Sequence, residues 1–396
     1  MSFSIIWTYV IAYFGLFTAI FFFVTYIENM QSIKNPKPRR FPSVSVIVPA
    51  YNEEKTIAKT ISSLQKLDYP KNKLKIIVVD DGSKDNTAAV VKKIKGVTFL
   101  QKQNGGKASA MNFGLEHCNT ELVASLDADS FVAPSALKKM VGYFENQSVM
   151  AVTPSLKVWK PRSALQKMQA IEYLIGIFLR KAFAFLGGIH VTPGPFSIYR
   201  KSFFDKYGYY DTHNLTEDIE IALRIQSKGY DIENSVDAEV FTVAPSKFKP
   251  LLKQRVRWYI GFIENVWNYR NLFSLKHNLG AFILPTSFIS IAFIIITLFY
   301  FIYEFVSRAA TYLFNFAAID FDLIRTINFR IDPFTFNTGA VLMFSLVSLV
   351  ISLLVLFAAK KLSNEKSKLK FSYLLYFIFY WVFFGIWWSA AFALKL

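Results

Sequence analysis

Long apolar runs occupy the two ends of this 396-residue chain and leave a more polar centre between them. The first run, Ile5–Tyr26, contains no charged residue, and three more follow the centre at about Leu279–Tyr303, Gly339–Ala359 and Phe371–Leu394. At about 1.5 Å per helical residue, each run is long enough to cross a bilayer core of roughly 30 Å. The pattern predicts four membrane spans, one before and three after a domain that lies outside the bilayer.

Basic residues between the apolar runs predict the orientation of the chain. Four of them follow the first run: Lys34, Lys37, Arg39 and Arg40. The stretch 360–370 holds five lysines and one glutamate. Because basic loops stay on the cytoplasmic side, we expect the N-terminus outside and the central domain in the cytoplasm of a multi-pass cell-membrane protein. The stretch Glu304–Thr338 is then expected to be an external loop.

The charge of the chain is strongly positive, with 45 lysines and arginines against 28 aspartates and glutamates and a formal net charge of +17. This charge clusters beside the apolar runs. Anionic membrane lipids and a negatively charged substrate are therefore better partners than nucleic acid. Cys118 is the only cysteine, which excludes an intrachain disulfide and is consistent with a reducing compartment.

The centre alternates short β-branched runs with helical patterns. Strands are expected at Val44–Pro49, Leu74–Asp80, Val97–Leu100 and Leu122–Asp127. Helices are expected at Glu53–Leu67, Asn86–Ile94 and Lys107–His117. Such alternation predicts an α/β domain with a mostly parallel sheet, whose ligands bind beyond the carboxyl ends of the strands.

Three of the predicted strands end in polar clusters, namely Tyr51-Asn52-Glu53, Asp80-Asp81 and Asp127-Ala128-Asp129. Carboxylates are ligands that Mg²⁺ and Mn²⁺ prefer, usually together with water and substrate phosphates. We therefore predict a divalent cation at Asp127 and Asp129; alone, this short motif would equally suit a solvated turn.

The other strand-end residues suggest a nucleotide. Asp80 or Asp81 could accept a hydrogen bond from a base or a ribose, although both would also suit a capped turn. Tyr51 could stack on the base or simply pack at the edge of the sheet. Gly105-Gly106-Lys107 precedes a predicted helix, where the backbone can approach phosphates closely and Lys107 adds positive charge.

Thr216-Glu217-Asp218 opens a further helical stretch. Acidic residues in the first turn of a helix are favoured by its dipole, which explains their presence without any chemistry. The alternative is that one of them is a general base that takes a proton from an acceptor hydroxyl. The sequence does not choose between Glu217 and Asp218.

Gln254-Arg255-Val256-Arg257-Trp258 lies between the centre and the second apolar run. Guanidinium groups bind phosphate oxygens in a fork geometry, and an indole offers an apolar face for a sugar ring. The segment therefore predicts a site for a diphosphate and a sugar. Pro161–Leu186 is amphipathic and is predicted to lie at the membrane interface, with a core helix of the central domain as the alternative.

Together these motifs resemble membrane-integrated glycosyltransferase family 2, and within it the processive polysaccharide synthases. The resemblance also includes Gly194-Pro195-Phe196-Ser197 and covers about Ser43 to Trp258. It implies a GT-A fold, a UDP-sugar donor and inversion at the anomeric carbon.

The resemblance also implies roles for single residues. Tyr51, Asp80 and Asp81 would hold the uridine, close to Glu53. Lys107 and Asp127 would contact the nucleotide, and Asp129 the metal. Asp218 would be the base. Trp258 would stack on the acceptor sugar. The diphosphate would be bound by Gln254, Arg255 and Arg257.

The expected organisation has four parts. Residues 1–40 form a span and a basic linker, 41–244 the catalytic domain, 245–276 an interfacial gating segment and 277–396 a membrane bundle. Relatives of this kind export their polymer through the bundle, and with four spans per chain a second copy could be needed to complete the outer opening. Transfer of one sugar to a membrane lipid is the main alternative function. A transporter with a nucleotide-sensing domain would leave Asp127, Asp129 and Asp218 without a joint purpose.

Overall fold

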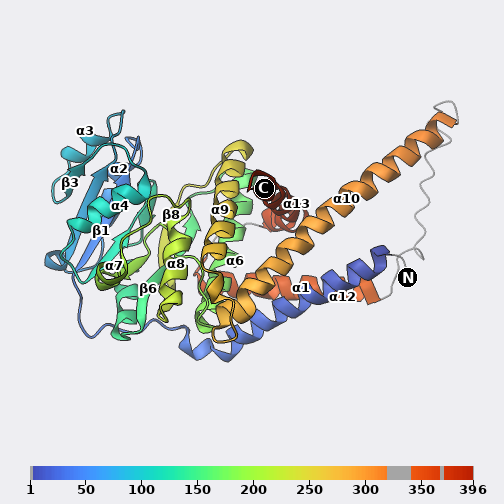
Figure 1. Ribbon diagram of the computed structural model, residues 1–396, viewed down its shortest axis with the longest axis horizontal. Helices are drawn as coiled ribbons and strands as arrows, with labels where there is room; N and C mark the ends of the chain where they lie inside the picture. Colours follow the sequence, from blue (N-terminus) through green and yellow to red (C-terminus); the bar gives the residue numbers. More distant parts are fainter. Residues whose placement is uncertain (1–2, 319–339, 366–369, 396) are drawn as a thin grey trace.

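A computed structural model describes residues 3–318, 340–365 and 370–395. Figure 1 shows a sheet domain at one end, with long helices extending from it. The strands are β1 (Val44–Ala50), β2 (Leu74–Asp80), β3 (Thr98–Gln101), β4 (Leu122–Ser125), β5 (Ser130–Val132), β6 (Val149–Val158), β7 (Ile198–Arg200) and β8 (Asp231–Thr242). The helices of the sheet domain are α2 (Ile57–Gln65), α3 (Thr87–Lys92), α4 (Lys107–Glu116), α5 (Ala136–Val141), α6 (Ala164–Phe185), α7 (Lys201–Tyr207), α8 (Glu217–Ser227) and α9 (Phe248–Asn268).

These strands form one sheet in the order β3-β2-β1-β4-β7-β6-β8-β5. Pairing is parallel between β1 and β2, β1 and β4, β2 and β3, and β6 and β8. The short strand β7 runs antiparallel to both β4 and β6, and joins the two parallel parts. The mostly parallel α/β sheet expected from the sequence is confirmed.

Both faces of the parallel strands are covered by helices, which explains why these strands read as continuous apolar runs. On β1, Val46 is buried in the layer that includes Ile61 of α2, and the next residue, Ile47, is buried in the layer that includes Met111 of α4. Alternate residues of a strand point to opposite faces. A single strand therefore anchors two core layers.

One predicted helix begins later than expected. The pattern Glu53–Leu67 predicted a helix from Glu53, but α2 starts at Ile57. The reason is that the backbone N–H of Glu53 donates to Thr87 Oγ1 at 2.7 Å, beside the start of α3. The segment after β1 is thus held as a turn against the neighbouring strand end, which keeps it near the carboxyl edge of the sheet.

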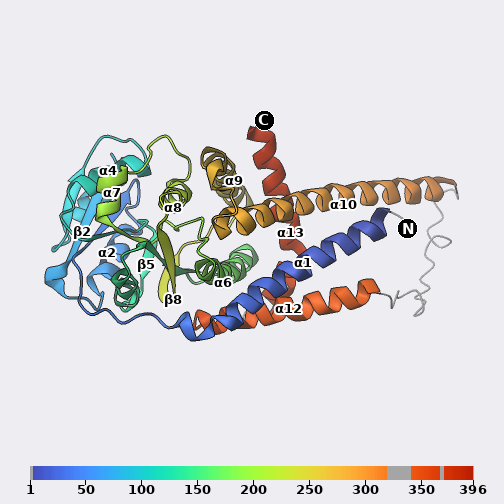
Figure 2. The ribbon, with the colours of Figure 1, turned by 60° about the horizontal axis from the view of Figure 1, so that its bottom comes forward.

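Within the described part of the chain, four helices are long and apolar enough to cross a membrane, one before the sheet domain and three after it, as predicted. They lie within α1 (Phe3–Glu28), within α10 (Leu284–Ala318) and the π-helical turn that precedes it (Leu279–Ile283), within α12 (Ala340–Leu362) and within α13 (Lys370–Lys395). Figures 1 and 2 show α1 beside α12, and α10 extending past the N-terminal end of α1.

The expected external loop Glu304–Thr338 is wrong in its first part, because α10 continues to Ala318. Apolar residues persist beyond Glu304, and Arg308 Nε lies 2.9 Å from Glu304 Oε2, an ion pair at the helical spacing of four. Residues 319–339 lie outside the described part of the chain.

Helix α6 lies between the sheet and the apolar helices (Figure 2). It contacts β6 and β8 on one side and α1, α12 and α13 on the other. A capping box starts it, in which Ser163 Oγ accepts from the Gln166 N–H and the Gln166 side chain accepts from the Ser163 N–H. Protein therefore encloses two sides of the segment that was predicted to lie at the membrane interface. In this respect α6 partly resembles the alternative, a core helix of the central domain.

Helix α9 carries the Gln254–Trp258 segment and packs against α8 and α13. Its approach to α8 requires Gly261, because a Cβ there would lie 2.2 Å from Thr216 Oγ1. Asn265 Nδ2 donates to the same hydroxyl at 2.9 Å. The close contact brings α9 next to the acids that begin α8.

Candidate active site

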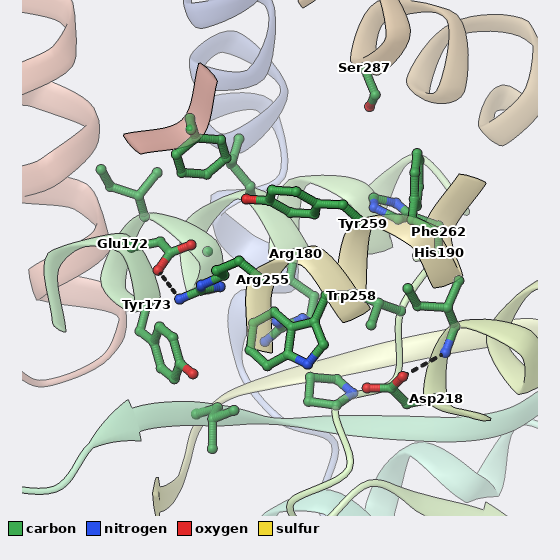
Figure 3. A pocket seen from close by; sticks show the side chains of 18 of the residues that line it. Glu172, Tyr173, Arg180, His190, Asp218, Arg255, Trp258, Tyr259, Phe262 and Ser287 are labelled. Atoms are coloured by element: carbon green, nitrogen blue, oxygen red, sulfur yellow. Dashed lines mark hydrogen bonds and ion pairs between the residues drawn. The ribbon is translucent and has the colours of Figure 1, made fainter. Parts of the chain in front are cut away.

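A cavity of about 830 Å³ lies where the sheet domain meets the apolar helices. Lys107, Asp127 and Asp129 line it on the side of the strand ends, and Asp218 of α8 lines it with Trp258 of α9. Figure 3 shows Asp218 and Trp258 in this cavity together with residues of α6. Polar side chains of the apolar helices line it as well: Thr18, Thr286, Ser287, Ser290 and Ser352. Lys107, Asp127, Asp129, Asp218 and Trp258 were predicted from separate parts of the sequence, and they thus line one cavity.

Lys107 is held between two carboxylates at the strand-end side. Its Nζ lies 2.6 Å from Asp127 Oδ1 and 2.9 Å from Glu217 Oε1. Burial disfavours its charge, but the two carboxylates raise the pKa of Lys107 well above its usual value. A side chain at Gly194 would collide with this arrangement, because its Cβ would lie 2.6 Å from Lys107 Nζ. This gives a physical reason for the glycine that opens the Gly194–Ser197 motif.

Asp127 and Asp129, the strand-end pair, are both partly buried. Burial, together with the nearby charges of Asp127 and Glu53, raises the pKa of Asp129 to about 6. Negative charge therefore accumulates here beyond what Lys107 compensates. Two carboxylates in this state fit a Mg²⁺ or Mn²⁺ ion that takes its other ligands from water and substrate phosphates. In the described residues, no group of three or more His, Cys, Asp and Glu side chains forms a complete metal cage.

Glu217 and Asp218 are neighbours in sequence with different environments. Burial disfavours the charge of Glu217, but Lys107 outweighs it and lowers the pKa of Glu217. Burial and the charge of Glu217 raise the pKa of Asp218 to about 7, although Lys107 and Arg257 act in the opposite direction. Asp218 Oδ1 accepts a hydrogen bond from the Ile219 N–H at 3.0 Å. Of the two acids, Asp218 has the pKa suited to proton transfer near neutral pH.

Gln254, Arg255, Arg257 and Trp258 all line the cavity, but the two arginines differ. Arg255 is buried, and its Nη2 lies 2.5 Å from Glu172 Oε2 of α6. Arg257 is exposed, and its Nη1 donates to the Leu215 carbonyl at 3.0 Å. Arg257 can therefore make the predicted contact with a diphosphate, whereas Arg255 is already paired with a carboxylate.

Trp258 lies over the Arg255 guanidinium, whose central carbon is 4.4 Å from the indole centroid. Glu172, the partner of that guanidinium, also accepts a hydrogen bond from the Tyr380 hydroxyl of α13 at 2.5 Å. Contacts of this kind fix the orientation of an aromatic ring. The indole predicted to hold an acceptor sugar is thus positioned by α6 and by an apolar helix.

The predicted uridine residues lie apart from Trp258, at the edge formed by β1 and β2. Tyr51 is 44% exposed, as a ring available for stacking would be. Glu53 Oε2 accepts from the Thr56 hydroxyl at 2.5 Å. Asp80 is buried, and its carboxylate accepts from the Ser83 N–H at 3.1 Å and from Gln101 Nε2 at 2.9 Å.

Asp81 binds the glycine pair that precedes Lys107. Its carboxylate accepts from the Gly106 N–H at 2.8 Å and the Gly105 N–H at 3.1 Å, and from Lys102 Nζ at 3.0 Å. These bonds hold the turn before α4 and so place Lys107. The structure therefore gives Asp81 an internal role beside the predicted nucleotide contact.

Sequence reasoning missed several residues of the cavity wall on α6. Glu172, Gly176 and Arg180 line the cavity at a spacing of four residues, which places them on one helix face. Glu172 and Arg180 are charged residues in an apolar stretch at that spacing, a signal that could have identified them. His190 also lines the cavity, and burial lowers its pKa to about 4.

Residues 45–208 match the family model described as Glycosyl transferase family 2. Over 240 residues the chain is 33% identical to a poly-beta-1,6-N-acetyl-D-glucosamine synthase of Staphylococcus epidermidis, with 59% of this chain and 58% of that protein aligned. Over 254 residues it is 34% identical to the synthase of the same name from Staphylococcus aureus strain COL, with 61% and 60% aligned. The alignments thus span less than two thirds of these relatives.

Among solved structures, the mannosyltransferase PcManGT from Pyrobaculum calidifontis, in complex with GDP-mannose and Mn²⁺, covers 91% of this chain and 99% of its own. The identity is 20% and the TM-score 0.55, which supports a shared fold. The matches confirm the predicted resemblance: the chain carries a glycosyl transferase family 2 domain flanked by helices that are apolar enough to span a membrane.

Proposed function

We propose that this chain, whose residues 45–208 form a glycosyl transferase family 2 domain, transfers sugars from a UDP-sugar to the hydroxyl of a growing polysaccharide. The observation that carries the proposal is the single cavity of about 830 Å³. It is lined by strand-end carboxylates, a carboxyl group with a pKa near 7, an indole and polar groups of the apolar helices. A donor, an acceptor and a departing polymer need these features side by side.

In the proposed reaction Asp218 removes the proton from the acceptor hydroxyl. The hydroxyl oxygen forms a bond to the anomeric carbon as the bond from that carbon to the diphosphate breaks, and the electron pair leaves with UDP. Attack from the side opposite the diphosphate inverts the configuration. Asp218 must be deprotonated to act, and its pKa of about 7 makes it an effective base at neutral pH.

The charge that develops on the leaving diphosphate needs compensation. Asp127 and Asp129 would hold a divalent cation, which when bound supplies positive charge to the diphosphate oxygens. Lys107 adds a fixed positive charge beside Asp127, and Arg257 offers an exposed guanidinium. Glu217 keeps Lys107 in place, since the two lie 2.9 Å apart. We assign Glu217 to this positioning role and Asp218 to proton transfer.

We further propose that the sugar is N-acetylglucosamine and the linkage β-1,6, because both curated relatives bear that product in their names. In this reading, UDP-N-acetylglucosamine enters at the strand-end side. The terminal sugar of the acceptor rests on Trp258, whose indole presents an apolar face to a sugar ring. The acceptor hydroxyl then lies next to Asp218.

The cavity also suggests the route of the product. Hydroxyl side chains of α1, α10 and α12 continue its lining: Thr18, Thr286, Ser287, Ser290 and Ser352. Such groups can exchange hydrogen bonds with sugar hydroxyls inside an apolar bundle. We propose that the polymer leaves between these helices, with the sheet domain in the cytoplasm and the N-terminus outside.

Transfer of one sugar to a membrane lipid is the second candidate function. The observation that favours it is the exposure of the outer part of α10, where Tyr303 is 66% and Phe314 is 77% exposed. Figures 1 and 2 show this part of α10 extending past the N-terminal end of α1. Membrane lipid that covers these surfaces would have access to the cavity as an acceptor. A second copy of the chain on the same surfaces would instead favour export of a polymer.

The two functions differ in product size. Purified protein is incubated with radiolabelled UDP-N-acetylglucosamine and Mn²⁺ without a lipid acceptor, and the products are sized; omission of the cation is the control. Long polymers are expected. Labelled products that carry one sugar and extract into organic solvent would instead support the second candidate. If no labelled product forms and no UDP is released, both candidate functions are contradicted.

A further inference from the structure

Among the described residues, four lysine and arginine side chains line the cavity, and they differ in how many of their hydrogen-bonding groups have partners in the protein. Lys107 has two carboxylate partners, and Arg255 has Glu172. Arg257 is exposed and donates to a backbone carbonyl. Within the described residues, the remaining one, Arg180 of α6, makes no hydrogen bond and no ion pair within 4 Å.

The Arg180 side chain is also only partly exposed. Its Nε is buried without a hydrogen-bond partner among the described residues. Burial lowers the pKa of Arg180 to about 10, which leaves the guanidinium protonated at neutral pH. Arg180 and Asp218 line the same cavity, and both are drawn in Figure 3. The Arg180 side chain faces the cavity from the same helix face as Glu172 and Gly176.

A guanidinium whose buried Nε has no partner is costly, because a buried donor without a hydrogen bond opposes folding. The groups that influence Arg180 electrostatically are Tyr173 and Asp218. Neither forms an ion pair with it, and Asp218 is the proposed base. A ligand with a negative charge would remove the cost. Phosphate is the anion best matched to a guanidinium, which binds two of its oxygens in a fork.

We propose that Arg180 is a phosphate-binding residue of this cavity, placed on the side where the acceptor meets the donor. The inference rests on the proposed function and deepens it. Two sources of phosphate are compatible with this position: the diphosphate of the donor nucleotide, and the phosphate of a lipid acceptor. The same guanidinium geometry would bind either.

The test uses the full-length protein in detergent with Mn²⁺ and two pairs of probes. UDP is compared with uridine, and a short-chain polyprenyl phosphate with the corresponding polyprenol. The affinity ratio within each pair isolates the contribution of the phosphate. The variant is Arg180→Gln. The control is Arg162→Gln, which removes an equal charge from an exposed residue just before α6.

Arg180→Gln should lower one of the two ratios by about tenfold or more, equivalent to about 1.4 kcal/mol, while Arg162→Gln leaves both unchanged. A lower UDP-to-uridine ratio assigns Arg180 to the donor. A lower ratio for the lipid pair assigns it to an acceptor phosphate. Both ratios unchanged, in a variant that still binds uridine, would overturn the proposal.

A variant that fails to fold is replaced by Arg180→Lys, which keeps the charge but loses the fork. This change should lower either the UDP-to-uridine ratio or the ratio of polyprenyl phosphate to polyprenol about threefold, because one charge-assisted hydrogen bond is lost. An unchanged ratio would again overturn the proposal. Neither ratio depends on sugar transfer, so the inference can fail while polymer is made, and it can hold if the proposed product is wrong.

Discussion

The two sides of the cavity are built differently. On the strand-end side, Lys107 lies between Asp127 and Glu217, so its charge is compensated by the protein. On the side formed by α6 and α9, buried polar atoms have no partner among the described residues: Arg180 Nε, Gln254 Oε1 and the Tyr259 hydroxyl. The first side is arranged before a substrate binds. The second has polar groups that a substrate would satisfy.

This difference has an energetic meaning. A buried donor or acceptor without a partner costs about 1–3 kcal/mol, so several of them in one wall are a considerable burden on stability. Such groups persist where a ligand supplies the missing partners. We infer that the strand-end side places the donor nucleotide, and that the wall of α6 and α9 (the acceptor wall) holds the acceptor at Trp258 and offers Arg257 and Arg180 to phosphate.

The largest expected effect comes from the acid between the two sides. Asp218→Asn removes the proposed base but keeps its shape, so transfer should fall by about 10²–10⁴-fold. Binding of UDP, measured by calorimetry with Mn²⁺, should change little. Glu217→Gln is the matched comparison and should alter UDP binding, because it removes a partner of Lys107. Undiminished turnover in Asp218→Asn would exclude it as the base.

A second change separates the acceptor wall from the strand ends. Gly261→Ala places a Cβ 2.2 Å from Thr216 Oγ1 and must displace α9 from α8. Because small displacements of reacting groups are costly, kcat/KM should fall by about 10²-fold. Gly15→Ala in α1 is the control, since nothing lies within 4 Å of its added Cβ. Equal activity of both variants would show that the contact of α9 with α8 is unimportant.

The pH dependence sharpens the distinction between Glu217 and Asp218. Because the pKa of Asp218 is raised to about 7, the base is protonated and inactive below that pH. Initial rates at saturating substrate should rise about tenfold per pH unit up to roughly pH 7 and then level. With Glu217 as the base, its lowered pKa would give a rate that is flat across neutral pH.

Trp258→Ala should have the smallest effect. Loss of an aromatic contact costs about 0.5–1.5 kcal/mol, so elongation from a short oligosaccharide should fall a few-fold to tenfold. Affinity for UDP should be retained, since Trp258 belongs to the acceptor wall. The stacking role is wrong if UDP affinity drops while acceptor use stays intact.

Local patterns predicted what local physics decides. The buried β-branched runs of β1 and β2 and the apolar spans both consist of consecutive apolar residues, so both were predictable. The acids at the ends of β2 and β4 followed from the same logic, because parallel strands bring their carboxyl ends to one edge.

Contacts between distant segments were not predictable in this way. The ion pair of Glu172 with Arg255 joins α6 to α9 across 83 residues, and no local sequence pattern predicts such a partner. Asp81, predicted to bind the nucleotide, also binds the turn before Lys107, and that contact across 25 residues was not predicted. The chain positions that hold the acceptor wall together depend on how α6 packs between the sheet and the apolar helices.

A structure of the protein with UDP, Mn²⁺ and a short β-1,6-linked N-acetylglucosamine oligomer would test the central claim most directly. We predict density for the metal at Asp127 and Asp129, with the terminal sugar of the oligomer on Trp258 and its reactive hydroxyl within hydrogen-bond distance of Asp218. Nucleotide bound outside this cavity, or an oligomer that does not approach Asp218, would contradict the account.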